Sequence, residues 1–233
     1  MNAAPLVLLP GLDGTGRLFR SLLAALPASL RAQVVAYPNQ MLDLQQLAAH
    51  VLHQLPAQRV VLLAESFSGL VALTLLANAA TRVHSVIFVG AFAEPPRPLL
   101  LRLAPVLSRA GPLARSAPSF LLRRYCLGPE ANAAELNELR TALAGVSVTV
   151  LAQRLALVAK MHSFRQVPPN VPAFYLRASD DRLVPASCAN WFQHRFKSCE
   201  VEEISGPHFL LQTKPRVCAE VILRIVQRSG KAA

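Results

Sequence analysis

Short, continuous apolar runs alternate with helical segments through the first part of the chain. The runs at 6–9, 60–64 and 83–89 are rich in Val and Leu and are short, which predicts strands buried on both faces. Among the segments between them, 18–26 carries leucines along one helical face, and 70–77 is apolar nearly all round, as in a buried helix. This alternation predicts a parallel sheet with helices on both faces.

The alternation stops after residue 93 and resumes near residue 168. The intervening stretch, 94–167, contains no convincing strand: prolines divide its first part into short apolar segments, and 130–160 is strongly helical. We interpret it as a helical cap inserted into an α/β core formed by 1–93 and 168–233, with about six strands in a mostly parallel sheet. The other elements that we expect are a helix at 42–55, strands at 34–37, 173–178 and 199–204, helices at 187–196 and 215–228, and a frayed tail at 229–233.

The turn after the apolar run 60–64 carries the first candidate chemistry. It reads A-E-S-F-S-G, so that small residues stand two positions before and two positions after Ser66. This is the pattern of a nucleophile elbow, a strand-to-helix turn with strained backbone at its central serine. Both outer glycines of the usual G-x-S-x-G form are replaced, by Ala64 and Ser68. Ser68 is the alternative nucleophile, but it would put Leu70 where a small residue is needed, and we therefore predict Ser66.

Two further loops follow predicted strands and supply an acid and a histidine. Asp181 begins the sequence D-R-L-V-P after the strand at 173–178, and His208 stands in G-P-H after the strand at 199–204. The chain order serine, aspartate, histidine is that of α/β-hydrolases. The sequence resembles this superfamily in its D-x-x-V-P acid turn and its histidine loop. P-G-L-D-G at 10–14 is similar to the oxyanion loop H-G-x-x-x-G with proline for histidine, and P-G-x-D-G-T-G looks like the phytyl ester synthase branch.

The resemblance implies an α/β-hydrolase fold and a Ser-His-Asp site. A serine hydroxyl is a weak nucleophile and needs an adjacent base, so His208 would take the proton of Ser66, while Asp181 would orient the imidazole and stabilise its charged form. The backbone N–H groups of Leu12 and Phe67 would form the oxyanion hole. The spacing to V-P favours Asp181 over other acids. The alternative acids are Asp180 and Glu94.

Composition and charge limit the classes of partner that the protein is expected to bind. The 233 residues are 53% hydrophobic and carry a net charge of +11, with ten Lys/Arg but only three Glu between 97 and 165. Such a basic region suits an anionic membrane surface or an acidic protein, whereas no motif for nucleic acid accompanies it. No apolar run approaches the roughly 20 residues that span a bilayer, and the N-terminus lacks a charged region typical of a leader, so we expect a cytoplasmic protein.

We expect neither a metal nor a cofactor. The four cysteines show no C-x-x-C spacing, which favours buried or idle thiols. His50 and His53 are spaced as a ligand pair on a predicted helix, but no third ligand accompanies them, and a solvated helix face is the better interpretation.

A serine triad with an oxyanion hole carries out acyl transfer, and we predict hydrolysis of carboxylic esters through an acyl-enzyme. Leu99, Leu103 and Leu107 are candidates to line the acyl pocket, and Arg123 and Arg124 to bind an acyl carrier protein or acyl-CoA. The second hypothesis is therefore a carrier- or CoA-directed (thio)esterase, similar to pimeloyl-carrier-protein methyl ester esterases, or an acyltransferase. A non-catalytic binding module is a third hypothesis, which the intact Ser-Asp-His set disfavours.

Overall fold

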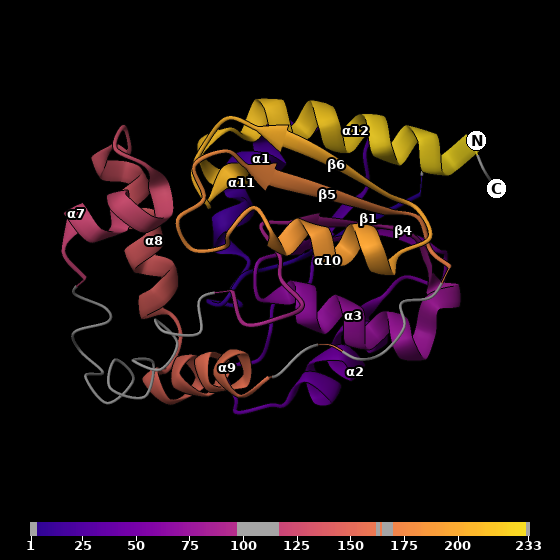
Figure 1. The fold of residues 1–233 in the computed structure, drawn as a ribbon, viewed down its shortest axis with the longest axis horizontal. Helices are drawn as coiled ribbons and strands as arrows, with labels where there is room; N and C mark the ends of the chain where they lie inside the picture. Colours follow the sequence, from indigo (N-terminus) through magenta and orange to yellow (C-terminus); the bar gives the residue numbers. More distant parts are fainter. Residues whose placement is uncertain (1–3, 97–116, 162–163, 165–169, 232–233) are drawn as a thin grey trace.

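A parallel sheet forms the centre of the molecule (Figure 1). Its six strands lie in the order β2-β1-β3-β4-β5-β6, and every neighbouring pair is parallel. The computed structural model describes residues 4–96, 117–161, 164 and 170–231, and it confirms the predicted sheet. The strands are β1 (Leu6–Leu9), β2 (Ala32–Val34), β3 (Val60–Glu65), β4 (Val83–Val89), β5 (Ala173–Ala178) and β6 (Cys199–Ile204).

Helices cover both faces of the sheet because its central strands are apolar on both sides. In β1, Leu6 and Leu8 enter one hydrophobic core, whereas Val7 and Leu9 enter the other. Figure 1 shows the two helical layers above and below the strands. One layer contains α1 (Arg20–Ala25), α11 (Leu210–Thr213) and α12 (Pro215–Lys231); the other contains α2 (Leu44–Gln54), α3 (Ser68–Ala79) and α10 (Cys188–Arg195).

Two predicted boundaries are wrong. The second strand occupies Ala32–Val34 rather than 34–37, because beyond it the Tyr37 backbone N–H bonds instead to the Gly14 carbonyl at 2.7 Å. The closing helix continues to Lys231 rather than fraying after 228. Its last turn is held by Ser229, whose hydroxyl bonds to the Ser85 hydroxyl at 2.8 Å.

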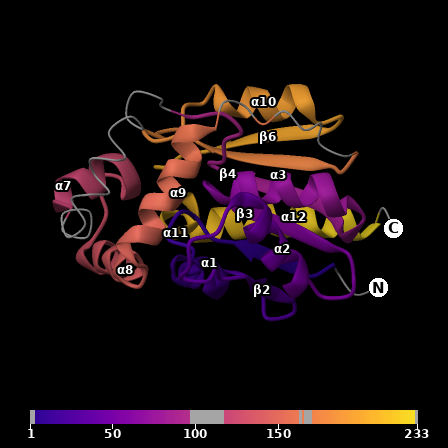
Figure 2. The ribbon, with the colours of Figure 1, turned by 90° about the horizontal axis from the view of Figure 1, so that it is seen from below.

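Between β4 and β5 the chain forms a set of helices that we call the inserted helices. They are α7 (Ser119–Leu122), the π-helical turn η3 (Arg123–Leu127), α8 (Ala133–Ala144) and α9 (Val148–Lys160). Figures 1 and 2 both place α7, α8 and α9 at the end of the molecule toward which the strand arrows point. Two further short helical turns in the described residues are η1 (Arg17–Phe19) and η2 (Ala80–Arg82). The assignment of 94–167 to a separate cap domain stays a prediction.

The predicted helical stretch 130–160 is two helices because each has its own start signal. Asn132 caps α8 in a capping box with Glu135, and the Ser147 hydroxyl accepts the Val150 backbone N–H at the start of α9. Within the described part of the chain, no single helix has the length and apolarity to cross a membrane. Among the described helices, α8 and α9 pass by length and composition when taken together, and they are bent by 94° where they meet.

Candidate active site

Ser66 stands at a sharp turn between β3 and α3. Its φ of 50° is the one positive value at a non-glycine position among the described residues. Such backbone is strained, and surrounding contacts hold it: the Ser66 N–H donates to the Val89 carbonyl at 2.9 Å. The helix start packs so closely that a Cβ on Gly69 would lie 2.7 Å from the Ala91 Cβ. The turn therefore has the geometry predicted for an elbow centred on Ser66.

The alternative serine has a different environment. Ser68 is fully buried, and its hydroxyl bonds both to the Pro10 carbonyl and to the Tyr37 hydroxyl. These bonds tie the start of α3 to the loop after β1. Ser68 thus fills the small outer position of the motif and uses its hydroxyl for structure.

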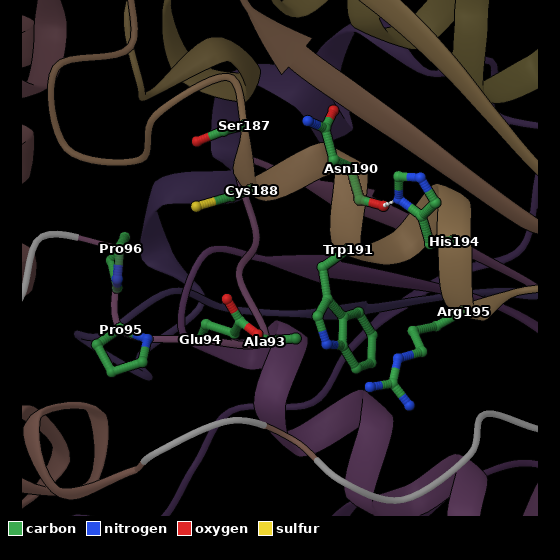
Figure 3. Close-up of a pocket in the computed structure, with 10 residues that line it drawn as sticks. All are labelled: Ala93, Glu94, Pro95, Pro96, Ser187, Cys188, Asn190, Trp191, His194 and Arg195. Carbon is green, nitrogen blue, oxygen red and sulfur yellow. Dashed lines mark hydrogen bonds between the residues drawn. The ribbon is translucent and has the colours of Figure 1, made fainter.

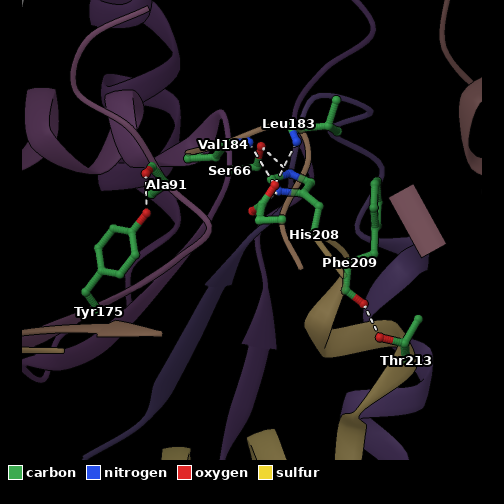
Figure 4. A network of polar contacts seen from close by, with 9 residues as sticks. Ser66, Ala91, Tyr175, Leu183, Val184, His208, Phe209 and Thr213 are labelled. Atoms are coloured by element: carbon green, nitrogen blue, oxygen red, sulfur yellow. Dashed lines mark hydrogen bonds and ion pairs between the residues drawn. The ribbon is translucent and has the colours of Figure 1, made fainter. Parts of the chain in front are cut away.

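The predicted base His208 lies beside Ser66 (Figure 4), and the predicted acid Asp181 contacts the other nitrogen of its ring. His208 Nε2 is 3.1 Å from Ser66 Oγ, and His208 Nδ1 is 2.7 Å from Asp181 Oδ2. The other carboxylate oxygen of Asp181 accepts the backbone N–H groups of Leu183 and Val184 at 2.9 and 2.7 Å. The side chains of His208 and Asp181 are only 6% and 5% exposed, so this chain of hydrogen bonds is shielded from water.

Neither alternative acid contacts the imidazole. Asp180 accepts a hydrogen bond from the Ser179 hydroxyl at 2.7 Å and is exposed. Glu94 lines a separate cavity of about 410 Å³ against α10, together with Cys188, Trp191 and Arg195 (Figure 3). The geometry therefore agrees with Asp181 as the partner of His208.

The two predicted oxyanion-hole residues line the cavity that contains Ser66 and His208. Leu12 lies in the loop after β1, and Phe67 is the first residue beyond the serine at the N-terminus of α3. The loop turns tightly, with the Gly14 N–H donating to the Gly11 carbonyl at 3.1 Å. A helix N-terminus favours negative charge, which suits the Phe67 N–H for an oxyanion.

A buried glutamate beside the nucleophile is a feature that the sequence analysis missed. Glu65 is 4% exposed and accepts a hydrogen bond from Gln212 Nε2 at 3.0 Å. Burial raises its pKa to about 7, and the nearby Asp13 adds to the rise. Glu65 thus ties the residue before Ser66 to α11, which directly follows the histidine loop, and it lines the same cavity as Gly11 of the oxyanion loop.

The cavity over Ser66 is apolar and measures about 270 Å³. Leu99, Leu103 and Leu107, the predicted lining, lie outside the described residues. The described lining of this cavity includes residues of the inserted helices. Sequence periodicity could not distinguish them from ordinary core residues, since residues of either kind are apolar and recur at helical spacing. The lining residues of the inserted helices are Leu122, Cys126, Leu139, Leu143, Leu155 and Val158.

Arg123 and Arg124, the predicted partner-binding pair, differ in exposure. Arg123 Nε donates to the Ala131 carbonyl at 3.1 Å, a contact within the inserted helices. Arg124 is exposed, with its guanidinium carbon 5.6 Å from the centre of the exposed Tyr125 ring. Arg124 is therefore the more exposed of the two.

One histidine considered as a metal ligand and two of the four cysteines can be placed in the structure. His50 Nε2 lies 3.0 Å from the Ala36 carbonyl, and no group of three or more His, Cys, Asp or Glu suited to a metal occurs in the described ranges. Burial raises the pKa of Cys126 and Cys218 to about 12, so these thiols are protonated at neutral pH.

The fold and the elbow define an α/β-hydrolase. Three solved structures illustrate the likeness: an esterase from Exiguobacterium antarcticum (TM-score 0.83, 16% identity), an enol-lactonase from Burkholderia xenovorans (0.84, 17%) and a bromoperoxidase from Bacillus anthracis (0.82, 20%). Each comparison covers 97% of this chain and 92% of the other. At such identities they establish the fold alone.

The sequence of residues 25–210 matches the family described as serine aminopeptidase, S33. The chain therefore belongs to this family within the α/β-hydrolase superfamily. No curated protein matches the chain in sequence. Family and fold together identify a hydrolase, and the activity that they support in general is ester hydrolysis.

Proposed function

We propose that the protein is a serine esterase that hydrolyses carboxylic esters of medium-length apolar acids. The observation that carries the proposal is the continuous contact from Ser66 Oγ through the His208 ring to Asp181, at 3.1 and 2.7 Å, on the wall of an apolar cavity. A nucleophile, a base and an orienting acid in hydrogen-bond reach are the requirements of acyl-enzyme catalysis.

In the proposed reaction, Ser66 Oγ attacks the ester carbonyl carbon while His208 Nε2 takes the hydroxyl proton. The N–H groups of Leu12 and Phe67 stabilise the resulting oxyanion. Collapse of the tetrahedral intermediate breaks the carbon–oxygen bond to the alcohol, which leaves with the proton from His208. A water molecule then attacks the acyl-enzyme with His208 again as base, and the acid is released as Ser66 regains its proton.

The cavity supports an apolar acyl group rather than a charged substrate end. A cavity of about 150 Å³ accommodates benzene, so the 270 Å³ here corresponds to about ten non-hydrogen atoms. Its two carboxyl groups already have partners: Asp13 accepts hydrogen bonds from Thr15, and Glu65 accepts one from Gln212. Burial also raises the pKa of Glu65 to about 7, which favours its uncharged form. Most of the remaining lining is apolar, so an uncharged ester is favoured.

The test uses p-nitrophenyl esters from acetate to laurate and a fluorophosphonate label on the full chain. We expect a maximum of kcat/KM between hexanoate and decanoate, and a label on Ser66. Ser66→Ala abolishes hydrolysis and labelling. Ser68→Ala is the matched control: it keeps both and lowers the free energy of unfolding by about 1–3 kcal/mol, because two buried polar groups lose their partner. Hydrolysis that survives Ser66→Ala would contradict the proposal.

A second candidate is a (thio)esterase that takes its acyl group from a carrier protein or coenzyme A. The net charge of +11 and the exposed Arg124 on the inserted helices favour it. The same acyl group is therefore offered as methyl ester and as coenzyme A thioester. An alcohol added as competing acceptor distinguishes hydrolysis from acyl transfer, because an acyltransferase forms the new ester in place of the free acid.

A further inference from the structure

An arginine from the inserted helices is buried against the oxyanion loop. Arg154 of α9 is only 2% exposed. Its Nη1 donates to the carbonyl oxygens of Leu12 and Asp13 at 2.9 and 2.7 Å, and its Nη2 donates to the Pro38 carbonyl at 3.3 Å. Its guanidinium carbon lies 5.6 Å from the centre of the Tyr37 ring. One side chain from the insertion thus holds two consecutive carbonyls of the loop.

Burying a guanidinium for packing alone would be unfavourable. A charged group loses much of its hydration in such a site, and only good hydrogen bonds compensate for the loss. The rest of this face of α9 is apolar, with Val150, Leu151 and Val158 buried. Arg154 is therefore the polar exception among the buried residues of α9, and its donors are directed at the loop backbone.

The loop is shaped to receive this arginine. Gly14 has a φ of +70°, and a Cβ at that position would lie 2.3 Å from Arg154 Nη1. The Leu12 carbonyl belongs to the peptide plane directly after the Leu12 Cα, and the Asp13 carbonyl belongs to the next plane. Holding both planes restricts the rotation of the Leu12 backbone. The direction of the Leu12 N–H is coupled to that rotation through the same Cα.

We propose that Arg154 is a positioning residue that aims the Leu12 N–H at the developing oxyanion. The inference rests on the proposed function, since it concerns the transition state of that reaction. Arg154 bonds to the loop from the side of the backbone carbonyls and does not touch the substrate. Its presence on α9 makes a complete oxyanion hole depend on the seating of the inserted helices against the loop.

The test compares Arg154→Ala with Arg140→Ala. Arg140 is the matched control because it also donates to oxygens far along the chain, the Ala117 carbonyl just before α7 and Ser119 Oγ in α7, without reaching the loop. With p-nitrophenyl octanoate, Arg154→Ala lowers kcat by about 10- to 100-fold, while KM changes little. This loss is smaller than that expected from removing an oxyanion donor altogether, because the Leu12 N–H is still present but less well aimed. Arg140→Ala keeps kcat within a few-fold of the wild type.

Three readouts separate positioning from a loss of folding. A trifluoromethyl ketone carrying the same alkyl chain forms an oxyanion on Ser66, so its Ki rises in Arg154→Ala by the same factor as kcat/KM falls; the parent methyl ketone binds as before. Guanidinium at millimolar concentration restores part of the activity of Arg154→Ala, and sodium chloride at equal ionic strength does not. Gly14→Ala, which displaces the guanidinium, gives a loss that is not additive with Arg154→Ala.

The outcomes are distinguishable. A wild type that neither hydrolyses the esters nor takes the fluorophosphonate contradicts the proposed function itself. An active wild type together with an Arg154→Ala variant of unchanged kcat overturns the positioning role and leaves the esterase proposal standing. Equal losses in Arg154→Ala and Arg140→Ala, or equal weakening of both ketones, overturn it as well.

Discussion

At the scale of single residues, two adjacent aspartates differ in what their carboxyl groups contact. Asp181 bonds to His208 and to two backbone N–H groups, whereas Asp180 bonds to the Ser179 hydroxyl and faces solvent. We expect Asp181→Asn to lower kcat by about 10⁴-fold, because an amide cannot hold the imidazole in the required tautomer. Asp180→Asn should stay within a few-fold. The measurement is the steady-state kcat of both variants on the same ester. Comparable losses of kcat in the two variants would contradict the assignment of Asp181 as the acid.

Glu65 makes stability depend on pH in a definite direction. Its pKa is about 7 in the folded chain against an ordinary value of 4.5, so the folded state keeps the proton over a range where the unfolded state has lost it. The stability that this group contributes is therefore complete below about pH 4.5 and falls as the pH rises to about 7, by on the order of 3 kcal/mol.

This dependence is isolated by comparing the wild type with Glu65→Gln in urea unfolding across that range. Gln cannot ionise. The free energy of unfolding of the wild type should therefore fall relative to that of Glu65→Gln as the pH rises, and the difference should level off above about pH 7. Subtraction removes the contributions of the titrating groups that do not interact with Glu65. A difference that does not change with pH would show that Glu65 has an ordinary pKa.

At the scale of elements, the inserted helices set the size of the acyl cavity. Leu143 of α8 lines it, and Leu143→Ala should move the preferred ester to longer chains, since each further buried methylene contributes about 0.8 kcal/mol. Leu136 of the same helix is buried without lining the cavity, which makes Leu136→Ala the matched control. It should lower stability and leave the profile of kcat/KM against chain length in place, and an equal shift in both variants would argue against a cavity bounded by α8.

The elements that sequence predicts well here are those whose signal is local. The apolar runs predict the buried strands, and the small residues around Ser66 predict the elbow. A buried strand requires consecutive apolar residues and a tight turn requires small ones, so both leave a pattern in neighbouring positions. Arg154 and Glu65 escaped notice because their partners are far along the chain: Arg154 bonds to Leu12 and Asp13, and Glu65 to Gln212. The cavity lining was missed for a related reason, since an apolar helix face looks the same over a core and over a cavity.

At the scale of the whole molecule, the excess positive charge predicts a dependence on salt. An anionic acyl-CoA or carrier protein should associate faster at low salt, with kcat/KM falling as salt screens the field, whereas a neutral ester of the same acid should not respond. Arg124→Glu should flatten the first curve. The control Arg31→Glu makes the same charge change before β2, at the opposite ends of the strands, and should have less effect. Equal salt slopes for the two substrates would remove the support for an anionic partner.

The position of the insertion has a consequence for how the protein folds. Strands β4 and β5 are neighbours in the sheet, yet the whole of 90–172 lies between them in the sequence. The strands up to β4, which position Ser66, pair with one another at shorter sequence separations. Asp181 and His208 follow β5 and β6, so they reach the site only after the long connection has closed. The entropic cost of closing that connection slows this step. During refolding, helical and core signals should thus recover before the serine becomes reactive, and newly made chains pass through a period in which they are largely structured and still inert.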